Sequence, residues 1–168
     1  KADICKLKHN DSFFKGVKYV FHFAGIGDIV PSIVNPSKYM LNNVQGTVKV
    51  LEASRFHKIK KFIYAASSSC YGKINGNTKE SERINIEHPY ALSKYLGEQV
   101  VFNWHKVYRL PINSIRIFNA YGPRVRTTGA YGAVMGVFLR QKIADKPLTI
   151  VGDGRQSRDF INVKDVVK

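Results

Sequence analysis

Two side chains with complementary acid–base chemistry stand four residues apart in this chain. Tyr90 and Lys94 form a Y-x-x-x-K pattern directly after His88 and Pro89. In a helix this spacing places both side chains on one face, within ~6 Å of each other. A phenol, whose pKa is near ~10, stays protonated at neutral pH, but a nearby ammonium stabilises the phenolate. Such a pair can exchange a proton with an alcohol, although the pattern also arises by chance in many helices.

A hydroxyl-rich segment precedes this pair in the sequence. Ser67 ends the strand-like run KKFIYAAS (60–67), and Ser68 and Ser69 lead on to Tyr71 and Gly72. A hydroxyl at the end of a buried strand can hydrogen-bond the same alcohol oxygen and orient it. Taken alone, a polar loop after a strand is the simpler interpretation. A strand, a serine run and then P-Y-x-x-x-K form a far more specific combination.

The elements that must position these residues alternate between short apolar runs and helical patterns. The sequence predicts strands at 17–25, 60–67, 112–119 and 148–151, and helices at 37–56, 89–108 and 130–145. Strands separated by helices of this length form βαβ units in a parallel sheet, so we expect an α/β fold. Ligands bind outside the carboxyl ends of parallel strands. Ala24, Ser67 and Asn119 stand at three such ends, which predicts one site along this edge.

The composition is that of a globular domain. The chain has 168 residues, 44% of them hydrophobic and 23% charged, which suits a single domain, and no apolar run approaches the ~20 residues that cross a membrane. Cys5 and Cys70 lack metal-ligand spacing, so we expect a reducing, cytoplasmic location and no metal site. The net charge of +15 would attract anions, but the basic residues are scattered, which makes nucleic-acid binding the less favoured interpretation.

Six segments together resemble the extended short-chain dehydrogenase/reductase family, in its NAD-dependent epimerase/dehydratase branch. They are HFAG (22–25), NNVQGT (42–47), YAASSSCYG (64–72), HPYALSK (88–94), RIFNAYGPR (116–124) and GDGRQSRDFINVKDV (152–166). The resemblance covers essentially the whole chain and implies a Rossmann-like, doubly wound parallel sheet with NAD as cofactor. The glycine-rich fingerprint of that fold does not occur in residues 1–168.

From the missing fingerprint we expect two partial regions. Residues 1–118 are expected to form part of the NAD-binding domain. Residues 119–168 are expected to begin a substrate-binding region interleaved with the last strands of the sheet. A fragment of this extent is expected to be inactive by itself, because it lacks the main pyrophosphate-binding loop.

The resemblance also implies a role for each matching residue. Ser67, Tyr90 and Lys94 match the catalytic set, and Lys94 also holds the nicotinamide ribose. Asn119 and Arg158 match residues that grip the substrate diphosphate, which suits a guanidinium. The remaining cofactor contacts implied in this way are Asp3, Ile4, Phe23, Ala24, Gly25, Asn43, Ala65 and Phe118. Phe23 and Phe118 are equally compatible with core packing, and Asp3 with an ordinary surface acid.

The residues after Ser67 indicate the reaction type. In this family sugar dehydratases typically carry Thr-Asp-Glu at this place and decarboxylases Thr/Ser-Ser-Glu, whereas Ser68 and Ser69 supply no carboxylate. Because elimination needs an additional acid and base, we expect epimerisation of a nucleotide sugar, at C4 of a UDP-hexose through a 4-keto intermediate, with Tyr90 as the base. The segment at 129–138 is similar to the corresponding segment of UDP-sugar 4-epimerases.

The sequence is also compatible with two alternative functions and implies one protein partner. Another enzyme of the branch (a dehydratase, decarboxylase or reductase) and a non-catalytic relative that binds RNA or protein both remain open. The resemblance also implies a homodimer built on the two long helices, at 37–56 and 89–108.

Overall fold

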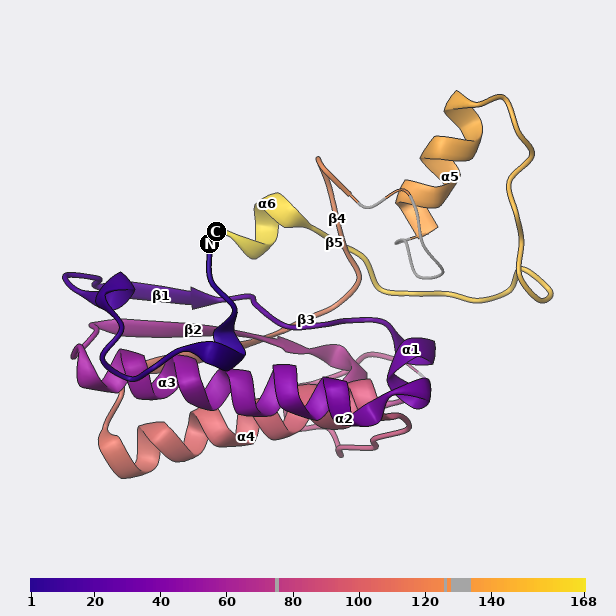
Figure 1. The fold of residues 1–168 in the computed structure, drawn as a ribbon. Coiled ribbons are helices and arrows are strands. Elements are labelled where there is room, and N and C mark those ends of the chain that lie inside the picture. Colours follow the sequence, from indigo (N-terminus) through magenta and orange to yellow (C-terminus); the bar gives the residue numbers. More distant parts are fainter. Residues whose placement is uncertain (75, 126, 128–133) are drawn as a thin grey trace. The chain divides into compact units, whose positions relative to one another are not determined.

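The computed structural model describes residues 1–74, 76–125, 127 and 134–168. These residues form two compact units, Lys1–Arg116 and Ile117–Lys168 (Figure 1). Both units contain parallel strand pairs together with helices, which confirms the predicted α/β class. None of the helices in the described ranges is long and apolar enough to span a bilayer.

A three-stranded sheet in the order β1-β2-β3 forms the centre of the first unit. The strands are β1 (Tyr19–His22), β2 (Lys61–Ser67) and β3 (Ile112–Ile117). β1 and β2 run parallel, with Tyr19 opposite Lys61 and His22 opposite Tyr64. Three of the four predicted strands are therefore confirmed, and each is shorter than its predicted range.

Two long helical stretches cover one face of this sheet (Figure 1). The first runs from α2 (Pro36–Tyr39) through a π-helical segment (Met40–Gln45) into α3 (Gly46–Phe56). The second is α4 (Pro89–Tyr108). At its start Nδ1 of His88 accepts the N–H of Ala91 at 3.1 Å, and Pro89 occupies a position that needs no N–H partner. The two predicted helices are confirmed, α4 to the residue.

Shorter helical turns complete the first unit. α1 (Ile29–Val34) lies between β1 and α2 in the sequence and packs against α4. Single 3-10 turns occupy Ile4–Lys6, Ser12–Phe14 and Ser68–Tyr71. The last of these begins directly after β2, so it carries the hydroxyl-rich segment at the carboxyl end of the sheet.

The core of the first unit lies between the sheet and the two long helices. It consists of Leu7, Val50, Leu51, Ile59, Phe62, Tyr64, Ala66, Val101 and Leu110. The alternation of a strand points Phe62, Tyr64 and Ala66 toward the helices. On α4, a Cβ added at Gly97 would lie 2.8 Å from the carbonyl oxygen of Asn43 and would strike the Tyr64 hydroxyl. Glycine at this position therefore lets α4 approach both the sheet and the neighbouring helix.

The second unit pairs β4 (Ala120–Tyr121) in parallel with β5 (Ile161–Asn162). Its helices are α5 (Val134–Ile143) and α6 (Val163–Val166). The helix predicted at 130–145 is confirmed from 134 to 143, and residues 130–133 lie outside the described residues.

The prediction of a strand at 148–151 is wrong. In the structure this segment is irregular, and Leu148, Ile150 and Val151 are exposed. The N–H of Thr149 donates to Oε1 of Gln141 on α5 at 3.2 Å, a side-chain partner in place of a neighbouring strand. A short apolar run becomes a strand only where another strand takes its backbone hydrogen bonds, and among the described residues none pairs with it.

Candidate active site

The serine and tyrosine singled out by the sequence meet at the carboxyl end of β2. Ser67 is the last residue of β2, and Tyr90 is the second residue of α4. The Tyr90 hydroxyl donates to Oγ of Ser67 at 3.4 Å. Ser67 Oγ also accepts the N–H of Ser69 at 3.2 Å and donates to Oγ of Ser69 at 3.0 Å. The serine is thus oriented by its own turn. Its hydrogen bond with Tyr90 is long, as catalytic hydrogen bonds often are before a substrate binds.

Lys94 lies one turn further along α4 and is buried. Its side chain is 9% exposed, and Nζ lies 4.5 Å from the centroid of the Tyr64 ring, within the range of a cation–π contact. Burial lowers the pKa of Lys94 to about 8, against the opposing effect of the Glu98 carboxylate. Lys94 is therefore still largely an ammonium at neutral pH, on the same helical face as Tyr90.

Two aromatic groups near Lys94, Tyr64 and His22, are uncharged at neutral pH. Burial raises the pKa of Tyr64, whose hydroxyl donates to the carbonyl oxygen of Lys94 at 3.2 Å. Burial, and then the charge of Lys94, lowers the pKa of His22 to about 4. Nε2 of His22 lies 2.9 Å from Oγ1 of Thr47, which donates its own proton to the carbonyl oxygen of Asn43 at 2.7 Å. His22 is therefore the donor to Thr47 and is neutral at physiological pH.

Asn43 connects the loop after β1 to the start of α4. Its Oδ1 accepts the N–H of Ile26 at 2.8 Å, and its Nδ2 donates both to the carbonyl oxygen of Ile26 and to Oγ of Ser93, each at 2.9 Å. Ser93 in turn donates to the carbonyl oxygen of Tyr90 at 2.8 Å. A Cβ added at Gly25 would lie 2.8 Å from Oδ1 of Asn43. Asn43 and Gly25 thus fit together closely, which holds the loop against the helix.

Further contacts fix the position of Tyr90. Its backbone N–H donates to Oγ of Ser32 on α1 at 3.1 Å. Its ring stacks on His88 with centroids 5.9 Å apart and meets Tyr39 edge-on at 6.3 Å. The tyrosine is held at its backbone and at its ring, which leaves its hydroxyl directed at Ser67.

The other predicted cofactor residues of the first unit are spread over several elements. Asp3 is exposed and accepts the N–H of Cys5 at 3.0 Å, which caps the turn that follows. Ile4 packs on α3, where a Cβ added at Gly46 would lie 2.6 Å from its Cδ1. Phe23 is 57% exposed, so core packing does not account for it in this unit, and Ala24 beside it is exposed too. The predicted residue in the middle of β2, Ala65, is buried.

Three predicted residues belong to the second unit. Phe118 is half-buried. Asn119 is exposed and donates from Nδ2 to the carbonyl oxygen of Asp159 at 2.7 Å. Arg158 is exposed and donates from Nη1 to the carbonyl oxygen of Ser157 at 2.7 Å. Their place in a common site with Ser67 and Tyr90 stays a prediction.

Four residues around the site were not predicted from the sequence: Tyr64, Ser93, Glu98 and Arg116. Ser93 is fully buried and Glu98 is 2% exposed. The sequence held a signal for these two, because they lie three and eight residues after Tyr90 on the helical face that it shares with Lys94. In the part of the chain that the structure describes, no group of three or more metal-binding side chains comes together. The arrangement can exchange a proton with an alcohol held between Ser67 and Tyr90.

Comparisons with known proteins match the chain to one enzyme family. The model of the NAD dependent epimerase/dehydratase family matches residues 1–168. An uncharacterised UDP-glucose epimerase of Bacillus subtilis, YtcB, is 37% identical over 158 residues, which are 94% of this chain and 49% of that protein. A dTDP-D-glucose 4,6-dehydratase of Dictyostelium discoideum is 28% identical over 192 residues, covering 97% of this chain and 43% of that protein. The chain thus spans about half the length of the curated relatives it matches.

Solved structures show the same likeness. The UDP-N-acetylglucosamine 4-epimerase of Methanobrevibacter ruminantium, in complex with UDP-N-acetylmuramic acid, superimposes with a TM-score of 0.93 at 35% identity, over 99% of this chain and 54% of that one. The UDP-glucuronic acid 4-epimerase of Bacillus cereus, with UDP-glucuronic acid and NAD, has a TM-score of 0.87 at 34% identity, over 99% and 52% of the two chains.

Proposed function

The chain belongs to the NAD dependent epimerase/dehydratase family, and from this premise we propose that it carries the proton-transfer groups of a nucleotide-sugar epimerase. The reaction proposed is inversion at C4 of a UDP-hexose. The observation that carries the proposal is the contact of 3.4 Å between the Tyr90 hydroxyl and Oγ of Ser67, with the largely charged Lys94 one turn away on the same helix.

The residues of the first unit fit NAD, the cofactor of this family. The loop from Phe23 to Gly25 is exposed at the carboxyl end of β1, beside the strand that ends in Ser67, and dinucleotides bind at such an edge. In the proposal Asp3 and Ile4 flank the adenine, the loop follows the adenosine, and Lys94 holds the nicotinamide ribose. Asn43 holds the loop through Ile26, and the remaining cofactor contacts proposed are Ala65 and, from the second unit, Phe118. When bound, NAD supplies a hydride acceptor that also returns the hydride.

The chain's own residues move the proton in this proposal. Ser67 hydrogen-bonds the C4 hydroxyl and orients it, and Tyr90 removes its proton as the C4 hydride leaves. Lys94 stabilises the phenolate by its charge. The 4-keto sugar formed in this way turns over in the pocket, and Tyr90 returns the proton after hydride arrives on the opposite face. Asn119 and Arg158 hold the diphosphate of the sugar nucleotide through both half-reactions.

The hydroxyls beside Ser67 favour epimerisation over elimination. Loss of water from the sugar needs an acid and a base in addition to the tyrosine. Ser68 and Ser69 offer only hydroxyls, and that of Ser69 already accepts the proton of Ser67 at 3.0 Å. This segment therefore lacks the carboxylates that would move the extra protons of a dehydratase.

A homodimer is proposed on the surface of the two long helices. Apolar side chains are exposed along both of them, among them Phe56 on α3 and Leu96, Phe102 and Val107 on α4. Burying such a strip between two copies would remove apolar surface from water.

The experiment is turnover of a panel of UDP-sugars by the full-length protein. UDP-glucose, UDP-N-acetylglucosamine and UDP-glucuronate are incubated with the protein and NAD, and the epimer at C4 is separated by chromatography. Interconversion of at least one pair, lost in Ser67→Ala, supports the proposal. Products that have lost water or carbon dioxide would contradict it.

A further inference from the structure

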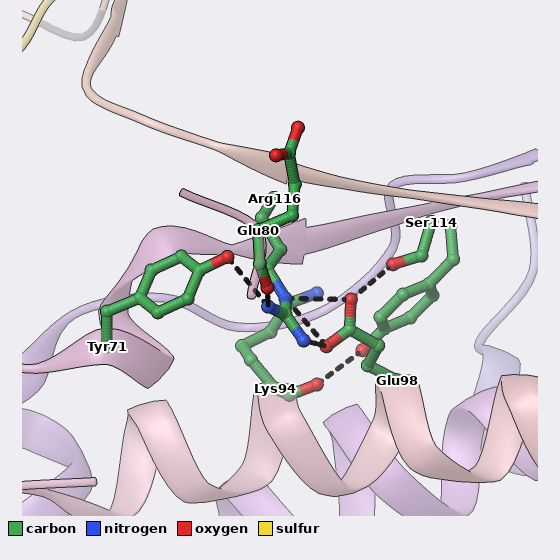
Figure 2. Close-up of polar contacts among 7 residues, drawn as sticks. Tyr71, Glu80, Lys94, Glu98, Ser114 and Arg116 are labelled. Carbon is green, nitrogen blue, oxygen red and sulfur yellow. Dashed lines mark hydrogen bonds and ion pairs between the residues drawn. The ribbon is translucent and has the colours of Figure 1, made fainter. Parts of the chain in front are cut away.

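An ion pair between the buried Glu98 and the partly exposed Arg116 connects α4 to β3 close to the proposed site (Figure 2). Glu98 lies one turn after Lys94 on α4 and is 2% exposed. Arg116 on β3 donates to both of its carboxylate oxygens, from Nη2 to Oε2 at 2.8 Å and from Nε to Oε2 and Oε1 at 3.0 and 3.2 Å. Ser114 donates to Oε1 at 2.6 Å. The carboxylate is therefore held from the sheet by two side chains.

The same guanidinium also holds the segment that follows Ser67. Nη1 of Arg116 donates to the Tyr71 hydroxyl at 2.7 Å and to the carbonyl oxygen of Glu80 at 3.3 Å. Its Cζ lies 5.0 Å from the centroid of the Tyr71 ring. Tyr71 ends the 3-10 turn Ser68–Tyr71, whose Ser69 orients Oγ of Ser67. Figure 2 shows Arg116 between the Tyr71 hydroxyl on one side and the Glu98 carboxylate on the other.

We propose that Arg116 is a positioning residue for proton transfer: its link between Glu98 and Tyr71 fixes the Ser68–Tyr71 turn against α4 and so holds Ser67 at the Tyr90 hydroxyl. The inference rests on the proposed function, in which Ser67 and Tyr90 act on one alcohol. α4 carries Tyr90 and Lys94, and the turn sets the orientation of Ser67, so Arg116 contacts both halves of the site without touching the reacting atoms.

Two physical arguments favour positioning over a contribution to stability alone. An ion pair with a buried carboxylate adds little net stability, because desolvation offsets much of the attraction between the two charges. A guanidinium, in contrast, has donors in a fixed fork and can hold several partners in one geometry. The Tyr90–Ser67 contact is already long at 3.4 Å, so a small shift of the turn would break it. A misplacement of ~1 Å in an active site costs on the order of 100-fold in rate.

Two mild substitutions separate the link from the ion pair. Tyr71→Phe keeps the ring beside the guanidinium and removes only the hydroxyl that accepts from Nη1. Arg116→Lys keeps a charge opposite Glu98, but a single ammonium cannot reproduce the fork that reaches Glu98, Tyr71 and Glu80 together. The matched control is Arg55→Lys, which alters another arginine–glutamate pair, Arg55–Glu52 on α3 at 2.9 Å. Arg55 is exposed, its pair lies against Trp104 and Tyr108 at the other end of α4, and it holds no part of the turn.

The test measures kcat and KM for the UDP-sugar in the full-length protein with NAD, together with the melting temperature of each variant. We expect kcat to fall ~10- to 100-fold in Tyr71→Phe and Arg116→Lys, with KM within about twofold of the wild type and Arg55→Lys unchanged. The proposal is overturned if both variants keep the kcat of the control. It is also overturned if kcat falls only in step with a loss of folded protein.

Hydrogen exchange distinguishes failure of this inference from failure of the proposed function. In the wild type the amide of Asn85 donates to the carbonyl oxygen of Cys70 at 2.9 Å, so peptides covering 68–87 report on the turn and the loop after it. If the wild type turns over no UDP-sugar, the proposed function fails. Faster exchange of these peptides in Tyr71→Phe and Arg116→Lys, but not in Arg55→Lys, would still establish the link. Unchanged exchange of these peptides in both variants would show that Arg116 does not fix the turn.

Discussion

Replacing Lys94 by methionine is expected to abolish turnover and, at the same time, to stabilise the folded protein at neutral pH. The ammonium is 9% exposed, and burial lowers its pKa from the ordinary value of 10.5 to about 8. At ~1.36 kcal/mol per pKa unit, this change corresponds to a cost of about 3 kcal/mol for keeping the charge in the folded state. Methionine has a similar length, carries no charge and fills the same space, but it forgoes the cation–π contact with Tyr64, worth roughly 0.5–2 kcal/mol. The net gain expected is therefore about 1–3 kcal/mol.

The dependence of this gain on pH follows from linkage. The folded pKa of Lys94 is lower than its unfolded value, so below about 8 the ammonium is present in both states and its full cost is felt. Between about 8 and 10.5 the folded protein releases the proton first, and the stability of the wild type rises relative to the variant. The advantage of Lys94→Met should therefore be largest at neutral pH and vanish near the unfolded pKa.

The assay is urea denaturation of the full-length wild type and variant between pH 7 and pH 10.5, followed by circular dichroism without added NAD, because Lys94 is proposed to bind the cofactor and bound NAD would stabilise the wild type selectively. Lys106→Met, an exposed lysine on the same helix, serves as the control and is expected to change stability by less than ~0.5 kcal/mol. A Lys94→Met variant that is destabilised at pH 7, or whose advantage does not shrink toward high pH, would refute the reasoning that burial makes this charge costly.

The remaining predictions concern single roles within the site. Tyr90→Phe is expected to retain NAD, measured by calorimetry, and to lose turnover by at least ~100-fold, the scale of a positioned acid–base group; near-normal turnover would remove Tyr90 from the mechanism. Arg158→Ala is expected to weaken nucleotide-sugar binding by roughly ten- to hundred-fold, because a charge-assisted bond to phosphate contributes ~1.5–3 kcal/mol. NAD binding should stay the same, whereas neutralising Lys60 and Lys61 together should change neither affinity; the opposite pattern in titrations would identify the basic surface as the functional feature. Glu98→Gln removes the charge that raises the pKa of Lys94 against burial, so the alkaline limb of the kcat profile should move to lower pH; an unmoved limb would mean that Lys94 does not set it.

The elements of the first unit were largely predictable because their signals are local. α4 could be placed to the residue, since His88 caps it and Pro89 suits its first turn. Strand ends and a helix start were enough to bring Ser67 and Tyr90 together, because parallel strands present their carboxyl ends at one edge. The strand predicted at 148–151 is absent because a strand depends on a distant partner strand, and a local apolar pattern does not show whether that partner is present.

The contacts that were missed are those between elements distant in the sequence. Arg116 meets Glu98 and Tyr71 only because β3 lies beside β2 and α4 packs against β2. Neither the spacing nor the composition of the sequence encodes that meeting. The pKa of Lys94 likewise depends on the burial produced by Tyr64, His22 and the packing around them, which a motif cannot convey. Spacing predicted the acid–base pair, whereas the fold determines its electrostatics.

The most direct test of the account follows the hydrogen at C4 of the sugar. The full-length protein is incubated in ordinary water with NAD and a UDP-hexose carrying deuterium at C4, and the product is examined by mass spectrometry and NMR. The account predicts the C4 epimer, with unchanged mass and the deuterium still at C4, because the hydride leaves and returns without meeting solvent while Tyr90 handles only the hydroxyl proton. A product lighter by water or carbon dioxide, or an epimer whose C4 deuterium has been replaced by hydrogen from the solvent, would contradict it.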